Sequence, residues 1–278
     1  MKKMFDDVSA KCSKIVTNLY STSFSLGIKF LGKKLHEPIY SIYGFVRFAD
    51  EIVDSFHGFD KSTLLEKFRA DTVDAIRDGI SLNPILNSFQ KVVNDYNIEW
   101  ELIEAFLNSM KMDLKKREHD QQSYDNYIFG SAEVVGLMCL KVFVDGDQQV
   151  FEKLRPFAMS LGSAFQKVNF LRDAKEDFEL LGRVYFPGVN VKALDVESKC
   201  AIEADIDKDF VHALVGIRQL PQDARMGVYL AYFYYKNLFN KIKAIPPHGI
   251  LSARVRIPNA QKFGLMFQCM IRHQLNML

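Results

Sequence analysis

Apolar residues recur every three or four positions along most of the chain, the periodicity of helices that bury one face. Alternating runs of Val, Ile and Thr bounded by Asn-Gly or Asp-Gly turns, as β-hairpins require, are absent from the sequence. The pattern therefore predicts an all-α fold. Pro38 is predicted to start a helix, and residues 182–190, which contain Pro187, to form a loop. The expected helices are residues 3–19, 21–30, 36–56, 61–78, 84–95, 98–117, 123–144, 147–178, 203–217, 221–243 and 258–275.

The composition is that of one globular domain spanning residues 1–278. Hydrophobic residues make up 48% of the chain and charged residues 25%, and no proline- or glycine-rich linker divides it. No apolar run approaches the roughly 18 residues that a membrane span needs. The N-terminal MKKMFDDVSAKC has acidic residues where a signal peptide needs its apolar core, so a cytoplasmic location is expected. The net charge of +2 argues against nucleic acid as a partner, and the four separated cysteines fit neither a zinc site nor a disulfide framework.

Pairs of aspartates four positions apart stand out among the polar residues. Such carboxylates share one helix face and repel each other unless something neutralises them. Two of the pairs lie in solvated surroundings and are interpreted as ordinary surface, whereas the other two lie beside large apolar side chains. The surface pairs are Asp74/Asp78 and Asp205/Asp209, and the pairs beside apolar residues are Asp50/Asp54 and Asp173/Asp177.

The two pairs beside apolar residues each belong to a longer polar stripe. On the first helix the stripe is Tyr43, Arg47, Asp50 and Asp54, and on the second it is Gln166, Asn169, Asp173 and Asp177. Polar groups on a largely buried helix cost a few kcal/mol each unless they are paired, so two such stripes are expected to face each other across a polar pocket. Paired carboxylates at this spacing suit Mg²⁺, which completes its coordination with water and phosphate oxygens. A phosphate-bearing ligand is therefore expected.

Three motifs carry a resemblance to the squalene and phytoene synthase family. They are YSTSFSLG (residues 20–27), RFADEIVD (47–54) and QKVNFLRDAKEDFELLGRVYFP (166–187), in this order along nearly the whole chain. The third is the most specific, because two amides, an arginine and two aspartates followed by Gly-Arg-x-Tyr-x-Pro rarely coincide by chance. The chain departs from the family pattern at Lys175, where glycine is common, and by an extra residue or so between Glu179 and Gly182.

The resemblance implies an isoprenoid synthase fold, in which two acidic helices face each other across a cavity and bind prenyl diphosphates through Mg²⁺, with Mn²⁺ as an alternative ion. The implied metal ligands are Asp50, Asp54, Asn169, Asp173 and Asp177. The implied catalytic residues are these four aspartates with Tyr43, Tyr127 and Tyr185. The implied substrate-binding residues are Ser21, Ser23, Phe24, Arg47, Gln166, Asn169, Arg172, Tyr235 and Arg254, with Arg256 as the alternative to Arg254.

The implied reaction joins two prenyl diphosphates head to head through a cyclopropylcarbinyl diphosphate. The segment YIFGSAEVVGLMC and the motif RFADEIVD are more similar to phytoene synthases, which favours two geranylgeranyl diphosphates and carotenoid biosynthesis. Dehydrosqualene or squalene formation from two farnesyl diphosphates is the alternative. No glycine-rich dinucleotide fingerprint is present, so NADPH is not expected and the reaction should end by proton loss. Because substrate tails and product are lipids, transient contact with a membrane surface is expected without a membrane span.

Two other classes are disfavoured by the motifs. A non-catalytic helical scaffold homologue would have eroded acidic motifs, whereas both are intact here. Chain-elongating prenyl synthases and terpene cyclases more typically carry Asp-Asp-x-x-Asp, which is absent at residues 50–54.

Overall fold

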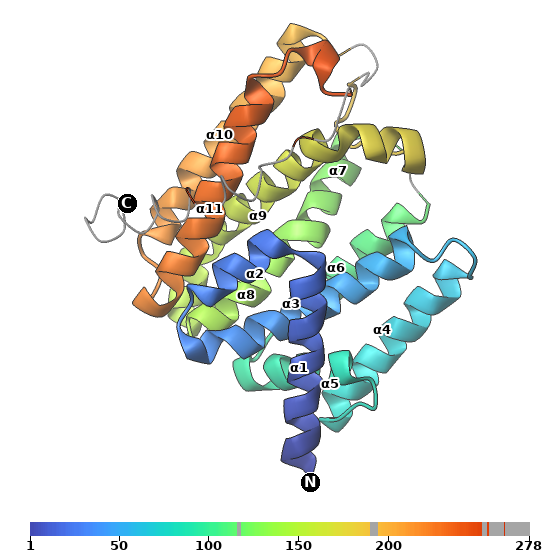
Figure 1. Cartoon of the computed structure of the whole chain (residues 1–278), viewed down its shortest axis with the longest axis vertical. Helices are drawn as coiled ribbons and strands as arrows, with labels where there is room; N and C mark the ends of the chain where they lie inside the picture. Colours follow the sequence, from blue (N-terminus) through green and yellow to red (C-terminus); the bar gives the residue numbers. More distant parts are fainter. Residues whose placement is uncertain (116–117, 190–193, 252–254, 256–263, 265–278) are drawn as a thin grey trace.

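The computed structural model describes residues 1–115, 118–189, 194–251, 255 and 264, without the side chains of residues 22 and 23. Throughout these residues the regular structure is helical, and they contain no strand, only an isolated bridge between Glu118 and Val184. The predicted all-α fold is confirmed. The elements in chain order (Figure 1) are α1 (Lys2–Tyr20), α2 (Thr22–Lys29), α3 (Lys33–Asp54), α4 (Lys61–Asp78), α5 (Pro84–Tyr96), α6 (Trp100–Asp113), α7 (Gln121–Ile128), η1 (Phe129–Glu133), α8 (Val134–Phe143), α9 (Gln148–Glu176), η2 (Asp177–Leu181), α10 (Val196–Ile217), α11 (Gln222–Lys243) and η4 (Pro247–Gly249).

Every helix expected within the described residues is present, and the differences lie at helix ends. Pro38 does not start a helix as predicted: α3 begins at Lys33 and contains it. The earlier start is held by Leu35, which is buried and donates its backbone N–H to the Gly32 carbonyl at 2.9 Å. α10 likewise begins at Val196 rather than residue 203, because Asp195 caps it: the Asp195 side chain accepts a hydrogen bond from the Ser198 N–H. The helix expected at residues 258–275 falls almost wholly outside the described part.

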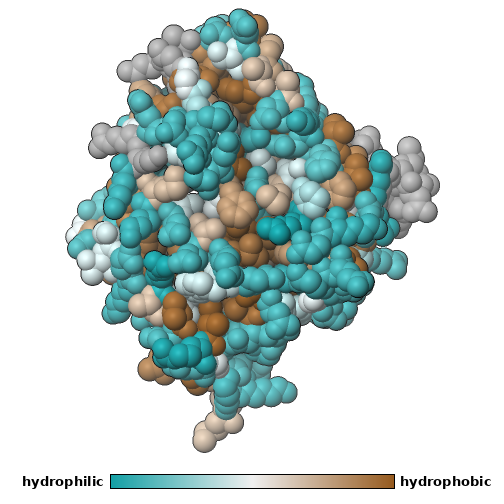
Figure 2. Space-filling view, turned by 180° about the vertical axis from the view of Figure 1, so that it is seen from behind, coloured by the Kyte–Doolittle hydropathy of each residue, from teal (hydrophilic) through white to brown (hydrophobic). Residues whose placement is uncertain are grey.

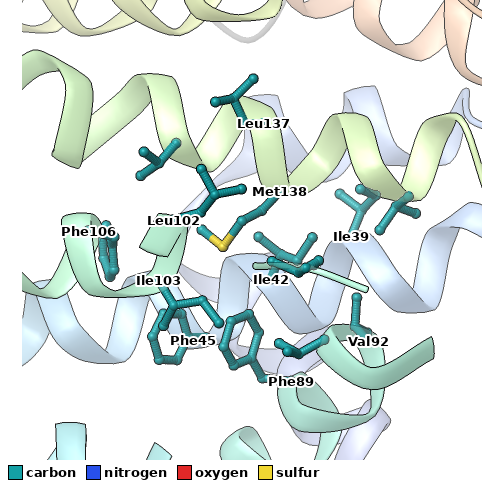
Figure 3. Close-up of a cluster of buried hydrophobic side chains, with 14 of the residues drawn as sticks. Ile39, Ile42, Phe45, Phe89, Val92, Leu102, Ile103, Phe106, Leu137 and Met138 are labelled. Atoms are coloured by element: carbon teal, nitrogen blue, oxygen red, sulfur yellow. The ribbon is translucent and has the colours of Figure 1, made fainter. Parts of the chain in front are cut away.

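Two large hydrophobic clusters build most of the interior, and a smaller one forms around Tyr124, Tyr127 and Tyr185. Of the two large clusters, one joins α3, α5, α6 and α8, and the other joins α9, α10 and α11, which occupy the upper part of Figure 1. In the first cluster Phe45 of α3 is fully buried and stacks on Phe89 of α5, with ring centroids 3.9 Å apart (Figure 3). Phe106 of α6 lies against the same ring at 5.6 Å. Each buried phenylalanine stabilises the fold by about 1.5–3 kcal/mol, so α3 is anchored firmly beneath its polar stripe.

The segment from α7 to α8 is a single helical run interrupted by the π-helix η1. Gly130 in η1 allows α6 to approach closely, because a Cβ at this position would lie 2.5 Å from the Ala105 carbonyl oxygen. Gly162 likewise allows α9 to approach η1 closely, because a Cβ at this position would lie 2.7 Å from the Ala132 carbonyl oxygen. Residues 121–143 are long and apolar enough to cross a membrane, but half of the most apolar window is buried inside the protein, as in a core helix. The segment is apolar because it packs between α6 and α9, where many of its side chains are buried.

Candidate active site

A cavity of about 570 Å³ lies between the two clusters and is lined by residues from α2, α3, α8, α9, α10 and α11, among others. It brings together nearly all the residues predicted from the sequence. Ser23 (its side chain) and Arg254, with the alternative Arg256, lie outside the described residues. The predicted residues that line the cavity are Ser21, Phe24, Tyr43, Arg47, Asp50, Asp54, Tyr127, Gln166, Asn169, Arg172, Asp173, Asp177, Tyr185 and Tyr235.

The stripe on α3 combines a guanidinium with carboxylates at one wall of the cavity. Arg47 forms an ion pair with Glu51 and lies 3.8 Å from Asp50, and its guanidinium sits 4.3 Å above the ring centre of Tyr20. The Nε atom of Arg47 is nevertheless buried without a hydrogen-bond partner in the described structure. A buried cationic donor with an unused N–H at a cavity wall suits an anionic ligand, because an unmade hydrogen bond of a charged group is costly.

The stripe on α9 forms the facing wall. Arg172 donates from Nε to Oδ1 of Asp173 at 2.9 Å, and a second bond from Nη2 makes the pair bidentate. Asn169 accepts a hydrogen bond from the Tyr235 hydroxyl at 3.2 Å. Tyr235 in turn stacks on Phe165, with ring centroids 4.0 Å apart. The polar groups of α9 are therefore fixed in position by neighbours on α9 and α11.

Asp113 and Arg183 join the site although the sequence interpretation missed them. The Arg183 Nη1 atom lies 3.0 Å from Oδ1 of Asp54 and 3.7 Å from Oδ1 of Asp113, and Nη2 donates to the Asp113 carbonyl at 3.1 Å. The Tyr127 hydroxyl donates to Oδ2 of Asp113 at 2.8 Å. Arg183 thereby ties the loop after α9 to the ends of α3 and α6.

A signal for Asp113 was present in the sequence. Phe106, Met110 and Asp113 follow a spacing of four and three, so the carboxylate continues the buried face of α6. Its side chain is only 6% exposed. Arg183 lies inside the third motif, but only the fold shows that it reaches α3.

Three cavity carboxylates carry raised pKa values. Burial raises the pKa of Asp50 to about 8, Arg47 acts against the rise, and Asp54 and Asp113 add to it. Burial raises the pKa of Asp113 and that of Asp177 to about 7, and Arg183 opposes both shifts. Nearly a third of the Asp50 side chain stays accessible, so this is a group in a confined cavity rather than a sealed one. The cavity holds more negative charge than its arginines compensate.

This charge excess fits a divalent cation. No group of three or more His, Cys, Asp or Glu side chains among the described residues stands close enough to enclose an ion alone. Mg²⁺ does not require such a cage, because it commonly binds one or two carboxylates and completes its shell with water and phosphate oxygens. The carboxylate and amide oxygens of the two stripes are therefore of the kind that Mg²⁺ binds.

An aromatic cluster borders the carboxylates. Tyr185 stacks on Phe170 with ring centroids 4.0 Å apart, and Tyr127 lies 5.2 Å from Tyr185. His119, which the sequence interpretation also missed, packs 5.2 Å from Tyr127 and 5.7 Å from Tyr185. At the opposite wall, burial raises the pKa of Tyr43 to about 12, so this hydroxyl stays neutral at physiological pH. Aromatic faces of this kind can stabilise a cation formed beside them.

The two remaining aspartate pairs do not line the cavity. Asp74 and Asp78 are exposed on α4, where both pair with Arg77, as predicted. Asp205 and Asp209 are less ordinary than predicted, because both carboxylates bind the ammonium group of Lys167, whose side chain is only 9% exposed. They neutralise a buried lysine and have a structural role.

The chain after α9 takes an unusual path. Asp177 begins the π-helix η2, and the Arg183 N–H donates to the Asp177 carbonyl at 2.9 Å. Gly182 follows with φ 65°, in the left-handed region that glycine adopts readily. A π-helical turn holds one residue more than an α-helical turn, which is consistent with the extra residue noted between Glu179 and Gly182. The chain then continues as a loop, as predicted from residue 182 onward, and this loop brings Arg183 and Tyr185 to the cavity.

Comparisons with known proteins agree with this arrangement. A sequence profile described as squalene/phytoene synthase matches residues 17–261. A presqualene diphosphate synthase of Zymomonas mobilis is 31% identical over 216 residues, covering 75% of this chain and 70% of that protein. A phytoene synthase of Arthrospira platensis is 23% identical over 275 residues, covering 89% of this chain and 87% of that protein.

Solved structures share the fold. A dehydrosqualene synthase in complex with a ligand superposes with a TM-score of 0.83 at 19% identity, covering 97% of this chain and 98% of that one. A squalene synthase from Alicyclobacillus acidocaldarius gives a TM-score of 0.75 at 19% identity, with 84% and 93% covered. These similarities confirm the predicted isoprenoid synthase fold.

Proposed function

Because the chain belongs to the squalene/phytoene synthase family, we propose that it joins two geranylgeranyl diphosphates head to head to form phytoene, without NADPH. At a coarser level the chain is a prenyltransferase-type synthase that acts on prenyl diphosphates. The observation that carries the proposal is the meeting of two arginine–carboxylate stripes, on α3 and α9, at the wall of one cavity whose remaining lining is largely apolar.

Diphosphate binding is assigned to the arginines of the two stripes. Arg47 has an unused N–H, and Arg172 lies at the facing wall beside Asp173. Asp50, Asp54, Asp173 and Asp177, with Asn169, would hold Mg²⁺. When bound, Mg²⁺ neutralises the charge that develops on the departing diphosphate. The arginines supply fixed positive charge at the same place, and such preorganised groups lower the barrier without having to move.

The apolar part of the cavity has a different task. The cation left after diphosphate departure reacts with water unless water is kept out, and an apolar lining excludes it. Phe165, Phe170, Tyr127 and Tyr185 present rings to the cavity, and each face that meets a cation contributes about 0.5–2 kcal/mol. Without a hydride donor the reaction ends by proton loss.

Small residues along the cavity favour the longer substrate. Alanine leaves room for a prenyl tail where a larger side chain would fill it. The alanines that line the cavity are Ala132, Ala158, Ala213 and Ala231. Each methylene buried in such a channel favours binding by about 0.8 kcal/mol, which supports geranylgeranyl over farnesyl diphosphate.

A second candidate function is supported by a separate observation. The 31% identical relative is a presqualene diphosphate synthase, a name that denotes the cyclopropylcarbinyl diphosphate stage. The alternative reaction is therefore condensation of two farnesyl diphosphates that stops at this stage or continues to dehydrosqualene or squalene.

The deciding experiment is mass analysis of the lipids that purified protein forms with Mg²⁺ from geranylgeranyl diphosphate or from farnesyl diphosphate, each with and without NADPH. Phytoene from geranylgeranyl diphosphate, regardless of NADPH, is the expected result. Presqualene diphosphate or dehydrosqualene from farnesyl diphosphate alone would establish the second candidate. Squalene that appears only with NADPH would contradict the assignment of an NADPH-independent reaction. No product from either substrate would overturn the proposed function.

A further inference from the structure

The outward face of α1 is apolar, whereas three of the four residues that it buries carry hydroxyl groups. A surface helix of a soluble protein ordinarily turns its apolar residues inward, so the arrangement is inverted. Four exposed aliphatic side chains fall on one helical stripe, and we call this stripe the outer face of α1. It consists of Met4 (71% exposed), Val8 (47%), Ile15 (57%) and Leu19 (80%). The residues that α1 buries instead are Ser9, Ala10, Ser13 and Thr17.

Hydrogen bonds hold the inward face in place. The hydroxyl oxygens of Ser13 and Ser88 of α5 are 2.6 Å apart, and Asn87 donates from Nδ2 to the Ser9 hydroxyl at 3.1 Å. On the side of α3, Gly44 allows close approach, because a Cβ there would lie 2.9 Å from the Ser13 hydroxyl. A rotation of α1 that buried the outer face would break these contacts. The exposed stripe is therefore built into the fold.

The outer face leads directly to the cavity. Leu19 is followed by Tyr20, and the next turn of chain brings Phe24. These two rings line the cavity while 49% and 37% of their surfaces, respectively, remain exposed. Exposed apolar and aromatic side chains therefore extend from the outer face of α1 to the half-exposed rings that line the cavity, and we call this region the cavity mouth. The Arg47 guanidinium lies 4.3 Å above the Tyr20 ring, so this route reaches the polar end of the cavity.

Charge beside the outer face is mainly positive. Lys3, Lys11 and Lys14 are exposed along one edge of the stripe, with Asp7 as the acidic residue on that edge. Asp6 turns inward, where it accepts a hydrogen bond from Asn87 at 3.0 Å. Apolar side chains edged by lysines are the pattern of helices that lie in the interface of anionic membranes.

We propose that the outer face of α1 lies on an anionic lipid bilayer and places the cavity mouth at the membrane surface; this rests on the proposed function, in which substrate tails and product are lipids. Figure 1 shows α1 on the near side of the molecule with no other helix over it, whereas the opposite face in Figure 2 is mostly hydrophilic with apolar residues in separate patches. The 19-residue helix is about 28 Å long and about 10 Å wide. It therefore offers roughly 300 Å², well below the roughly 800 Å² per partner of a stable protein interface, which favours a bilayer over a second copy.

Vesicle flotation tests the proposal without any substrate. Full-length protein is mixed with phosphatidylcholine vesicles that contain or lack about one third phosphatidylglycerol. We expect the protein to float with the anionic vesicles, and the combined variant Val8→Ser, Ile15→Ser, Leu19→Ser to lose roughly tenfold or more in partitioning. The matched control Val196→Ser, Val211→Ser, Val215→Ser removes three exposed valines from α10 and should leave flotation unchanged. Thermal melts of both variants verify that the fold is kept.

The outcomes separate this proposal from the proposed function. Prenyl transfer without flotation, or flotation lost equally in both triple variants, overturns the membrane assignment and leaves the reaction intact. Flotation that depends on the outer face, in a protein that converts no prenyl diphosphate, supports the surface and refutes the reaction. A dimer in sedimentation velocity that the α1 variant converts to a monomer would assign the outer face to a second copy and overturn the proposal.

Discussion

The two ends of the cavity are built in different ways. At the polar end, side chains are fixed by directed contacts, such as the 3.0 Å bond from Arg183 to Asp54. At the apolar end, the wall is shaped by residue size: a Cβ at Gly216 would lie 2.2 Å from the Cβ of Phe157, so the absence of a side chain there sets where that ring can lie. Phe157 and Asp173 both line the cavity from α9, and their separation in the sequence corresponds to about 24 Å along the helix.

Single substitutions should therefore have abrupt effects at the polar end of the cavity and graded effects at the apolar end. Removal of one charge at the polar end leaves its partners buried and uncompensated, which is costly in a confined site. A change of one or two methylenes at the apolar end alters which tail fits while leaving the chemistry in place.

Loss of a carboxylate from either stripe should nearly abolish turnover. Asp50→Asn and Asp173→Asn each remove a charge assigned to the metal–diphosphate site, and we expect kcat to fall roughly 100- to 1,000-fold. Asp74→Asn is the matched control, because Asp74 is paired with Arg77 on the exposed surface of α4. Steady-state kinetics at saturating Mg²⁺ measure the effect. Equal losses in all three variants would contradict the division of the aspartate pairs into cavity and surface pairs. In the wild-type protein, EDTA should stop the reaction, and added Mg²⁺ should restore it.

Removal of Arg183 should destabilise the fold through the polar end. Its partner Asp113 is only 6% exposed, so Arg183→Met leaves a buried carboxylate unpaired and should lower the free energy of unfolding by about 3–5 kcal/mol. Arg183→Met combined with Asp113→Asn should recover part of the loss. Urea denaturation of the single and double variants measures this coupling.

The control for this cycle is Arg69→Met. Arg69 pairs with Glu104 where both side chains are more than a third exposed, so at most about 1 kcal/mol is expected. A loss as large as that of Arg183→Met would show that burial is not the cause.

The sequence was sufficient for the fold class and for both stripes, because helical spacing alone puts Arg47, Asp50 and Asp54 on one face. It could not supply contacts made between distant elements. Asp113 and Arg183 are 70 residues apart, and their contact depends on how α6 and the loop after η2 pack. The inverted α1 was hidden for a similar reason: a periodic apolar stripe indicates a helix, but only the packed structure shows which side of that helix faces outward.

Stability without metal should fall as pH rises. The pKa of Asp50 is raised to about 8 in the folded protein, and those of Asp113 and Asp177 to about 7. The unfolded carboxyls titrate near pH 4, so between roughly pH 4 and 8 the folded state binds more protons, and the free energy of unfolding decreases with rising pH. Asp50→Asn keeps this position neutral and should weaken the decrease, whereas Asp74→Asn should not.

Melting curves in EDTA from pH 5 to pH 8.5 measure the slope, with a change of about 2–4 °C for each kcal/mol. Added Mg²⁺ should raise the wild-type melting temperature more at the upper end of this range, because the ion replaces protons on the same carboxylates. Parallel slopes for wild type and Asp50→Asn would show that the raised pKa does not govern stability.

The smallest effect on overall turnover is expected at the apolar end, where paired substitutions should move substrate preference in opposite directions. Ala213 of α10 and Phe157 of α9 both line the cavity. Ala213→Leu adds bulk and should favour farnesyl diphosphate, and Phe157→Ala removes a ring and should favour geranylgeranyl diphosphate. The ratio of the two kcat/KM values should shift about tenfold each way, since one or two methylenes in an apolar pocket discriminate by about this factor. The Mg²⁺ requirement should stay the same in both variants, because Asp173 lies about 24 Å from Phe157 along α9, and Ala213 lies on α10, outside both acidic stripes. If both variants shift the ratio in the same direction, or lose turnover as Asp50→Asn does, then cavity depth does not set tail length and the two ends are not separable.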